Sequence, residues 1–261
     1  MKAYEIIEKL FTFGSDFNYT QTCDTLKCGS PYADVTKVAV AMFPTVDLIK
    51  EAHKWGAELL IVHEPAYYNH MDDHSDELVE TKKRELLEST GMTMYRFHDH
   101  PHRNYPDLIA EGEFKYMNLD ADVEFTRDFD LVRAKFHKPV TPVELCKLIE
   151  ERLGIKHLRI CGTRDVPCTN LSAMFGAPGD VMHELSRPET EMLLIGETCE
   201  WRLGEYARDA SQLGINKALI IMGHVGSERA GMVHTADLLA EMIPEVEVKY
   251  FECGEVFTYT D

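Results

Sequence analysis

The hydrophobic pattern alternates between short apolar runs and longer segments with helical spacing. Residues 38–42 and 58–62 are short apolar runs typical of buried strands. Between them, Thr45 is placed to cap a helix that continues to Trp55 and stops at Gly56. A strand, a helix and a second strand in this order indicate a parallel sheet with a right-handed crossover. The first third of the chain therefore predicts an α/β fold.

The same criteria predict further elements on both sides of this unit. We expect a loop at residues 14–34, which are rich in Gly, Asn, Thr, Ser and Cys, and a Thr-x-x-Glu capping box at the start of the helix from Thr141. The remaining expected elements are helices at 4–12, 76–90 and 141–153 and strands at 92–97, 131–136, 158–162 and 171–175.

A similar order of elements returns near the C-terminus. Residues 192–195 predict a strand, 200–213 a helix that stops at Gly214, and 217–222 a strand that runs into Gly223-His224. The earlier unit likewise ends in a histidine, so the two form a loose pseudo-repeat. We therefore predict two similar, tightly packed α/β halves, residues 1–130 and 131–261, with mainly parallel sheets flanked by helices.

Composition and charge limit the functions open to this fold. A formal charge of −18 over 261 residues disfavours a nucleic-acid interface or an anionic lipid surface, and the apolar runs are too short to cross a bilayer. The N-terminus does not resemble a signal peptide. The seven cysteines lack CxxC spacing, and Cys23 and Cys28, which could pair or bind metal, have no accompanying second pair. We expect a cytoplasmic protein with reduced thiols.

Three predicted strands end in potential metal ligands, the first in His63-Glu64-Pro65. Ligands of open parallel sheets bind at the carboxyl ends of strands. Pro65 cannot donate to the sheet and holds Glu64 extended, so both side chains of the pair can face one site once the strand has ended. Two neighbouring ligands aimed at different ions would suit a dinuclear centre. The alternative is a surface histidine beside a solvated glutamate.

The second strand runs into a segment that contains His98, Asp99, His100 and His102. Imidazole prefers zinc, iron, nickel or copper, and a carboxylate also suits manganese. A histidine-rich surface loop is the alternative to a metal site here.

The third strand leads into His224 and Glu228, which share one face if a helix begins near Val225. Gly223 and Gly226 let the backbone approach a bound ion closely. An exposed pair without a ligand role is the alternative, but three such segments at three strand ends together favour a metal site.

Other catalytic templates are missing from the sequence. It contains no GxGxxG after a strand, no Walker lysine loop, no GxSxG elbow and no HExxH. A nucleotide-binding α/β domain without metal would need a glycine-rich phosphate loop, which the chain lacks.

Taken together, these segments resemble the NIF-three-like dinuclear-metal proteins, often described as GTP cyclohydrolase I type 2 homologues. The resemblance covers nearly the whole chain and is most specific for the Gly-His-x-x-[Ser/Thr]-Glu motif. The matching segments, in order, are Asp24–Gly29, Val38–Pro65, Tyr95–His102, Ile195–Glu197 and Gly223–Glu228.

The resemblance implies two divalent ions, with zinc, iron or manganese as the expected metals. Carried over by position, the metal ligands are His63, Glu64, His102, His224 and Glu228. Relative to the family pattern, Glu64 replaces a histidine and His102 replaces an aspartate, so a carboxylate and an imidazole have exchanged places. A bridge between the ions would then come from Glu64, Glu228 or water. The resemblance also implies a homo-oligomer, a hexamer.

The function expected on this basis is that of a metal-dependent hydrolase for a small-molecule substrate that the sequence does not identify. His98, Asp99 and His100 are the candidates for moving protons. The alternative is a metal-binding assembly or regulatory protein that acts through partners without catalysis. Open coordination positions would favour catalysis, and a closed shell would favour a structural role.

Overall fold

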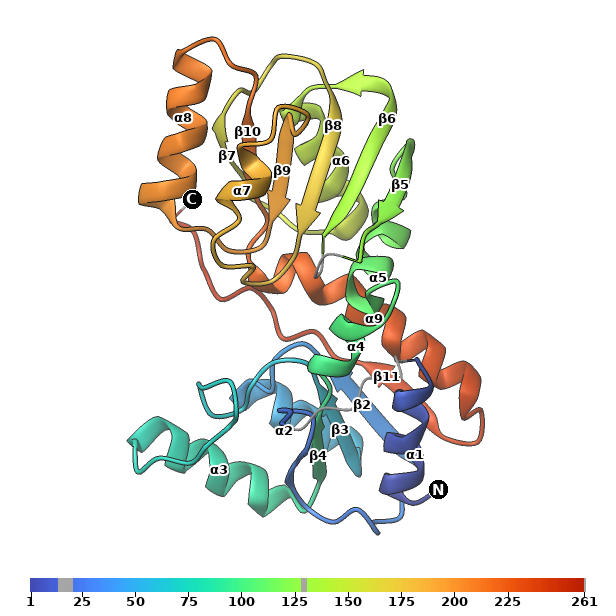
Figure 1. Cartoon of the computed structure of the whole chain (residues 1–261). Helices are drawn as coiled ribbons and strands as arrows, with labels where there is room; N and C mark the ends of the chain where they lie inside the picture. The colour runs from blue at the N-terminus through green and yellow to red at the C-terminus, as the bar shows by residue number, and fades with distance from the viewer. Residues whose placement is uncertain (14–20, 128–130, 261) are drawn as a thin grey trace. The chain divides into compact units, whose positions relative to one another are not determined.

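The computed structural model describes residues 1–13, 21–127 and 131–260, which form two compact units (Figure 1). Unit 1 comprises Met1–Ile109 with Gly231–Asp261, and unit 2 comprises Ala110–Ala230. This division differs from the predicted one at residue 130, because the residues on either side of that point pair as neighbouring strands of one sheet. The C-terminal segment, in turn, returns to unit 1.

Unit 1 is built on a five-stranded sheet with the order β1-β4-β3-β2-β11, in which only the β1–β4 pairing is antiparallel. The predicted parallel strand-helix-strand unit is confirmed, since β2 and β3 pair in parallel from Val38–Leu59 to Ala41–Val62. The strands are β1 (Leu26–Cys28), β2 (Lys37–Ala41), β3 (Leu59–Val62), β4 (Thr93–Arg96) and β11 (Glu247–Tyr250).

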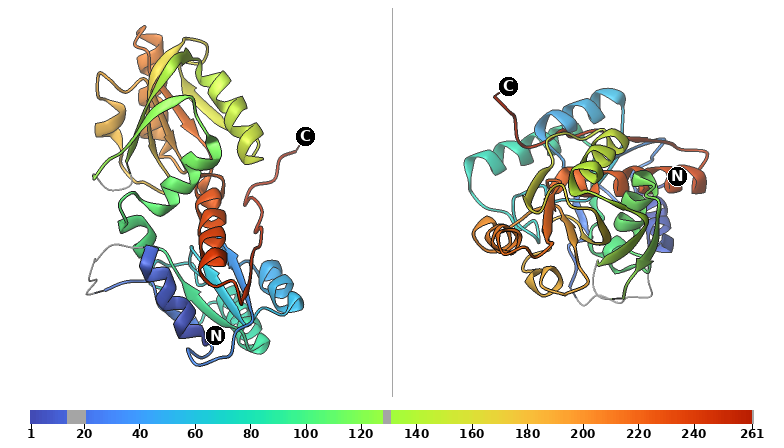
Figure 2. Two further views of the ribbon diagram at one scale, coloured as in Figure 1. Left: turned by 90° about the vertical axis from the view of Figure 1, so that its right-hand side faces the viewer. Right: turned by 90° about the horizontal axis from the view of Figure 1, so that it is seen from above.

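Helices cover both faces of this sheet (Figures 1 and 2). The helical segments of unit 1 are α1 (Ala3–Leu10), η1 (Phe11–Phe13), α2 (Val46–Trp55), α3 (Leu78–Thr90) and α4 (Asp99–Arg103), together with the C-terminal part of α9 (His224–Met242). Apolar residues of α1 and α9 pack on one face, and those of α2 and α3 on the other. The predicted caps of α2 are present: Thr45 accepts a hydrogen bond from Leu48 N, and Gly56 ends the helix at φ 90°.

Unit 2 contains a six-stranded mixed sheet with the order β5-β6-β8-β9-β10-β7, in which β8, β9 and β10 are parallel and the other pairings are antiparallel. Its strands are β5 (Ala121–Phe125), β6 (Val132–Val140), β7 (Arg159–Gly162), β8 (Cys168–Met174), β9 (Met192–Ile195) and β10 (Ala218–Ile221). Its helical segments are α5 (Leu108–Met117, shared with unit 1), α6 (Pro142–Leu153), α7 (Met182–Leu185), the π-helical turn η2 (Glu200–Gly204) and α8 (Glu205–Gln212).

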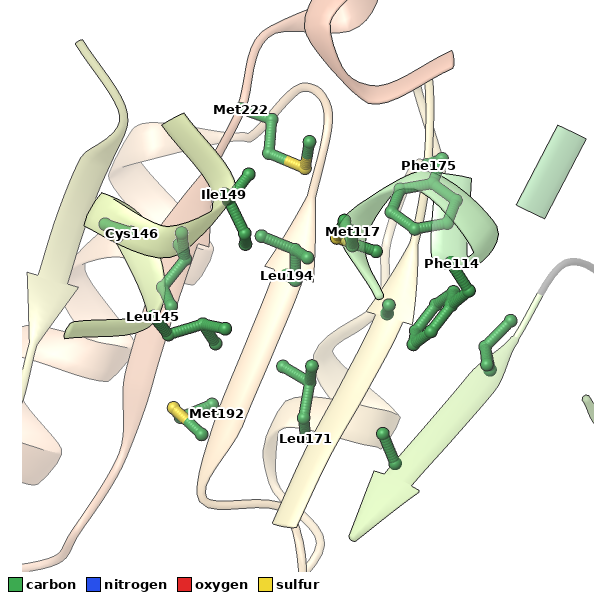
Figure 3. Close-up of a cluster of buried hydrophobic side chains, with 14 of the residues drawn as sticks. Phe114, Met117, Leu145, Cys146, Ile149, Leu171, Phe175, Met192, Leu194 and Met222 are labelled. Carbon is green, nitrogen blue, oxygen red and sulfur yellow. The ribbon is translucent and has the colours of Figure 1, made fainter. Parts of the chain in front are cut away.

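The core of unit 2 also has two layers of apolar side chains, one on each face of the sheet. Figure 3 shows the layer in which Phe114 and Met117 of α5 and Leu145 and Ile149 of α6 pack on Leu194 and its neighbouring strands. Residues of α7 and α8 form the layer on the opposite face. None of the helices in the described part of the chain has the length and apolar character that a bilayer crossing requires.

The two strand-helix-strand units bring histidines to equivalent places. His63 follows β3 at its carboxyl end, and His224 follows β10 and begins α9, as the sequence predicts. Three strands were not predicted: β1 within the expected loop, β5 in an acidic stretch, and β11 near the C-terminus.

Candidate metal centre

His63 and Glu64 lie just beyond the last residue of β3, where the chain leaves the sheet. The backbone N–H groups of both residues donate to Met42 O, at 3.1 and 2.9 Å. The His63 side chain is fully buried, and its Nδ1 donates to Phe97 O at 3.0 Å. Because Nδ1 carries the proton, Nε2 of a neutral ring presents its lone pair.

The lone pair of His63 faces the equivalent atom of His102, with the two Nε2 atoms 3.1 Å apart. His102 is oriented in the same way, since its Nδ1 donates to Asp107 Oδ2 at 2.9 Å. Two lone pairs at this distance repel unless a cation lies between them. Two imidazole nitrogens on one tetrahedral zinc ion, each at about 2.0–2.1 Å, would be roughly 3.3 Å apart. The observed spacing therefore suits shared coordination.

Burial is the main cause that holds the pKa of His63 well below its usual value, and the neighbouring His98 and His102 rings lower it further. The ring is therefore neutral at pH 7, which is the form that binds a metal ion.

His98 joins the pair by the same arrangement. Its Nδ1 donates to Asp99 Oδ1 at 3.1 Å, and its Nε2 lies 3.7 Å from Glu64 Oε1. One nitrogen from each of His63, His98 and His102 lies within 4.8 Å of the other two. Each ring is thus held by an oxygen at Nδ1, which is how metal-binding histidines are usually oriented.

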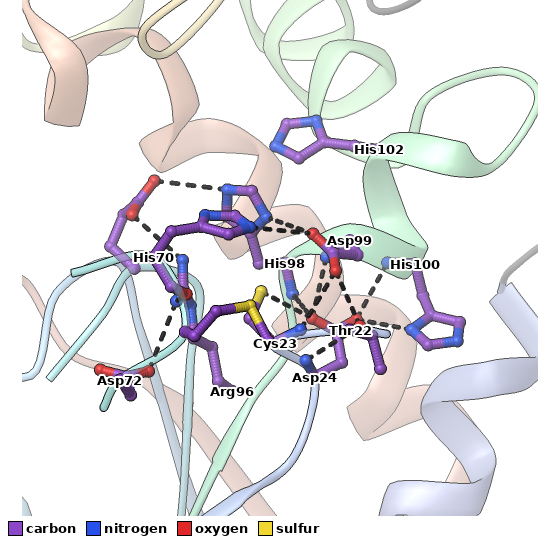
Figure 4. A network of polar contacts seen from close by, with 12 residues as sticks. Thr22, Cys23, Asp24, His70, Asp72, Arg96, His98, Asp99, His100 and His102 are labelled. Atoms are coloured by element: carbon purple, nitrogen blue, oxygen red, sulfur yellow. Dashed lines mark hydrogen bonds and ion pairs between the residues drawn. The ribbon is translucent and has the colours of Figure 1, made fainter. Parts of the chain in front are cut away.

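Asp24 anchors the segment that carries these histidines (Figure 4). Its buried carboxylate accepts the backbone N–H groups of His98, Asp99 and His100 at 2.7, 2.8 and 2.9 Å. It also accepts Nδ1 of His100 at 2.6 Å, which directs this ring away from His102. Burial acts to raise the pKa of Asp24, but these hydrogen bonds outweigh it and hold the pKa below its usual value. His100 therefore belongs to the support of the segment.

Asp99 is likewise a support, for His98. Besides His98 Nδ1, the carboxylate accepts Thr22 Oγ1 at 2.8 Å and Cys23 N at 3.2 Å. Burial opposes ionisation, yet the hydrogen bonds from His98 and Thr22 hold the pKa of Asp99 well below its usual value.

Cys23, His70 and Asp99 form a second group whose potential ligand atoms lie within 4.8 Å of one another. Burial strongly raises the pKa of the Cys23 thiol, so the sulfur is protonated at pH 7. Since metals bind the thiolate, this group is a weaker candidate than the three histidines.

Arg96 lies behind the site and is 1% exposed. Its Nε donates to His63 O at 2.9 Å, and Nη1 lies 3.4 Å from Asp72 Oδ2. Its Nη2 lies 3.6 Å from Glu64 Oε2, so the buried guanidinium is an ion-pair partner of this carboxylate. This residue sits beside the glutamate that replaces the histidine expected from the sequence comparison.

Unit 2 contains the remaining predicted ligands, His224 and Glu228, in the first turns of α9. His224 Nδ1 donates to Glu197 Oε1 at 2.7 Å, and its Nε2 lies 3.2 Å from Glu228 Oε2. The predicted helical i, i+4 pairing is confirmed. A fourth histidine thus has one nitrogen held by an oxygen and the other aimed at a carboxylate.

Glycines make room for this pair. A Cβ on Gly176, which has φ +61°, would lie 2.2 Å from Glu228 Oε1, and one on Gly196 would lie 2.4 Å from Ser227 Oγ. Ser227 Oγ accepts a hydrogen bond from Gly176 N and donates one to His224 O, each at 2.9 Å. The Ile195-Gly196-Glu197 turn therefore has two roles. Gly196 leaves room for Ser227, and Glu197 orients the His224 ring.

The donor sets fit divalent transition metals. Unit 1 brings together the predicted candidates His63, Glu64 and His102 with His98, while unit 2 brings together His224 and Glu228. Imidazole nitrogen with carboxylate oxygen suits zinc, iron and manganese. The orienting groups Asp24, Arg96 and Asp107 were not predicted.

Comparisons with known proteins identify relatives over most of the chain. Residues 1–255 match the family described as Duf34/NIF3 (NGG1p interacting factor 3). A "GTP cyclohydrolase 1 type 2 homolog" of Clostridium perfringens is 23% identical over 224 residues, covering 84% of this chain and 83% of that protein. A corresponding homolog of Clostridium acetobutylicum is 22% identical over 215 residues, covering 80% and 78%.

Solved structures share the fold over nearly their whole length. A hypothetical protein of Staphylococcus aureus, SA1388, superposes with a TM-score of 0.76 at 16% identity and covers 99% of both chains. A Bacillus cereus protein related to NIF3 gives a TM-score of 0.75 at 14% identity, with 100% of this chain and 99% of that chain covered.

Proposed function

Because the chain belongs to the Duf34/NIF3 family, we propose that it binds two divalent metal ions and uses them in hydrolysis. The proposed ligands are those implied by the sequence: His63, Glu64, His102, His224 and Glu228. The observation that carries the proposal is the 3.1 Å approach of two Nε2 atoms whose rings are both held at Nδ1. Zinc, iron and manganese are the proposed metals.

The number and placement of the proposed donors support two ions rather than one. A single catalytic zinc site uses three protein ligands and keeps one position open, whereas five ligands are proposed here. Adjacent His63 and Glu64 at one strand end are suited to serve different ions. When bound, such ions supply Lewis acidity toward a substrate oxygen and lower the pKa of a bound water to about 7.

Among the three candidates for proton transfer, we assign that role to His98. Asp99 orients the ring through Nδ1, which leaves Nε2 directed toward Glu64 at 3.7 Å. An imidazole that is held at one ring nitrogen can accept and release a proton at the other, which is the requirement for general acid–base catalysis. His100 is committed to Asp24 and Asp99 to His98, so both act as positioning residues.

The substrate is a small molecule, and the names of the Clostridium relatives make GTP the first compound to assay. Fold and family do not specify a reaction, so a panel of phosphoesters, cyclic amides and nucleotides is needed beside it.

Metal analysis of the purified protein, followed by this panel with and without chelator, tests the proposal. We expect close to two ions per chain and a hydrolytic activity that the chelator removes and added metal restores. Trace metal in protein prepared with zinc, iron or manganese would refute the metal centre. Full metal content without turnover of any substrate would favour the assembly or regulatory protein instead.

We further propose a homohexamer in the cytoplasm. The oligomer rests on the family resemblance, and the location on seven cysteines that are all unpaired. Light scattering should give about six times the 29.8 kDa chain mass, and a monomer would contradict it.

A further inference from the structure

A cavity of about 430 Å³ opens in unit 2 next to the side chain that orients His224. That side chain, Glu197, is part of the cavity wall. The segment after β8 supplies Gly179 and Asp180, and the segment after β9 supplies Thr198 and Trp201. This volume lies within the range of small-molecule sites, about 300–1,000 Å³. The cavity therefore has both the size and the place to hold the organic part of a substrate.

Trp201 gives the cavity an aromatic wall. The residue is 75% exposed although indole is among the largest apolar groups, so most of its surface is available to a ligand. It belongs to η2, a π-helical turn, and such turns occur frequently at functional sites.

Thr198 adds an unused polar group to the same wall. Its Oγ1 is buried and makes no hydrogen bond to any residue in the described ranges 1–13, 21–127 and 131–260. Buried hydroxyl groups are rarely left in this state, so the atom is suited to a partner outside the chain.

The charged groups that line the cavity favour a positively charged ligand. Its lining holds two carboxylates, Asp180 and Glu197, and one guanidinium, Arg202. Arg202 is already paired with Asp180 at 2.9 Å, so it is not available as a strong anion receptor. The excess carboxylate and the electron-rich indole face both attract positive charge, as does the overall charge of −18.

We propose that this cavity binds a planar, positively charged heteroaromatic ring that stacks on Trp201, and that it thereby sets the substrate class of the adjacent centre. The substrate assignment rests on the proposed function, whereas binding of the ring does not. Thr198 and Glu197 line the same cavity, where their side-chain oxygens are acceptors for the hydrogen-bond donors of such a ring.

The test uses three probes that share one ring size and differ in charge: 1-methylnicotinamide, nicotinamide and nicotinate. Calorimetric titration of the full chain, stripped of metal, should rank their affinities as cation, neutral amide, then anion. Trp201→Ala should weaken binding of 1-methylnicotinamide at least fivefold, and Trp201→Phe should retain most of it, because stacking needs an aromatic face. Since Trp201 is exposed, neither change should unfold the chain.

Fluorescence provides a second readout, because the chain has only one other tryptophan, Trp55. In a Trp55→Phe variant, the cation should quench Trp201 along a saturating curve that gives the calorimetric affinity. A linear quenching curve, equal affinity for the three probes, or unchanged binding by Trp201→Ala would overturn the proposal. A change of oligomer mass in Trp201→Ala, without probe binding to the parent, would instead assign the indole to contact with a second copy of the chain.

Metal content of the same samples separates the two proposals. Probe binding by a protein that takes up no metal would leave the ring site intact and remove the metal centre. Two ions per chain without probe binding would do the reverse.

Discussion

Nε2 of His63 lies 3.1 Å from Nε2 of His102, and when both rings are neutral with the proton on Nδ1, these two atoms face each other as lone pairs and not as a hydrogen bond. The approach is enforced from behind, by Phe97 O on one ring and by the Asp107 carboxylate on the other. The residues behind the rings are therefore as informative to change as the rings themselves.

Asp107→Ala should lower metal affinity about 10–100-fold, because His102 then loses the acceptor that fixes its orientation. Competition with a chromophoric chelator measures this change. Asp120→Ala is the matched control, since Asp120 holds the exposed His137 at 2.7 Å and should leave metal affinity unaltered. Equal affinities for both variants and the parent would show that His102 is not a ligand.

Gly176→Ala should displace Glu228 and reduce the metal content of the protein. The new Cβ would come within 2.2 Å of Glu228 Oε1, and the φ of +61° adds backbone strain of about 1 kcal/mol. Elemental analysis and denaturant unfolding report the two effects separately.

Gly179→Ala is the control that measures the loss of stability from backbone strain alone. Gly179 has φ +73°, and a Cβ there meets no atom within 4 Å. It should lose a similar amount of stability but keep its metal. If Gly176→Ala also keeps full metal content, Glu228 is either able to move or not a ligand.

Glu184 should make the fold sensitive to acid. The residue is 1% exposed, and although burial acts to raise its pKa, hydrogen bonds from Arg133 and Ser172 lower it to about 2. A carboxyl pKa that is lower in the folded than in the unfolded state stabilises the fold above pH 4.5, and this contribution is lost as the pH falls toward 2.

Urea unfolding at pH 6 and pH 2 measures this contribution. Between these values the parent should lose about 2–3 kcal/mol more than Glu184→Gln, which cannot titrate. Glu189→Gln is the control, because the Glu189 side chain is 68% exposed, and it should follow the parent. Identical pH dependence in Glu184→Gln would show that the buried ion pair does not govern acid stability.

Relative to the family pattern, Glu64 and His102 have exchanged a carboxylate and an imidazole. We therefore expect the effects of substitutions at these two positions on metal affinity to be coupled. Glu64→His and His102→Asp should each weaken metal binding, and the double variant should recover much of the loss by restoring three imidazoles and two carboxylates. Because Arg96 Nη2 lies 3.6 Å from Glu64 Oε2, both variants that carry Glu64→His should also be less stable than the parent.

Calorimetric metal titration of the parent, both single variants and the double variant tests this coupling. Strictly additive losses would contradict a compensating exchange, and would leave His98 as the ligand from that segment.

The fold is predictable from sequence where the signals are local. Thr45 and Gly56 delimit a helix by their own chemistry, and apolar runs on either side give β2 and β3. By contrast, β5 alternates apolar and acidic residues and is mostly exposed, so it lacks the buried apolar run that marks β2 and β3 and lies at the sheet edge paired with β6. Strand β11 depends on pairing with β2, which lies near the other end of the chain, and no local pattern reveals such a partner.

In the candidate site, the candidate ligands could be predicted from the sequence but the residues that orient them could not. His63, Glu64 and His224 follow apolar strands, and this position together with their metal-binding side chains made them candidates. The orienting residues have no such signal. Asp24 acts on His98 from 74 residues away, and its role follows only from the tertiary structure.

Unit 1 is made of two separate stretches of the chain, and this limits the order in which the two units can fold during translation. Unit 2 is one continuous stretch, so every strand of its sheet has been translated before the ribosome reaches β11. Unit 1 still lacks the C-terminal part of α9 on one face of its sheet and β11 at its edge. Since domains fold as they emerge when their segments are complete, the inserted unit can fold first, and the N-terminal residues must wait for the end of the chain.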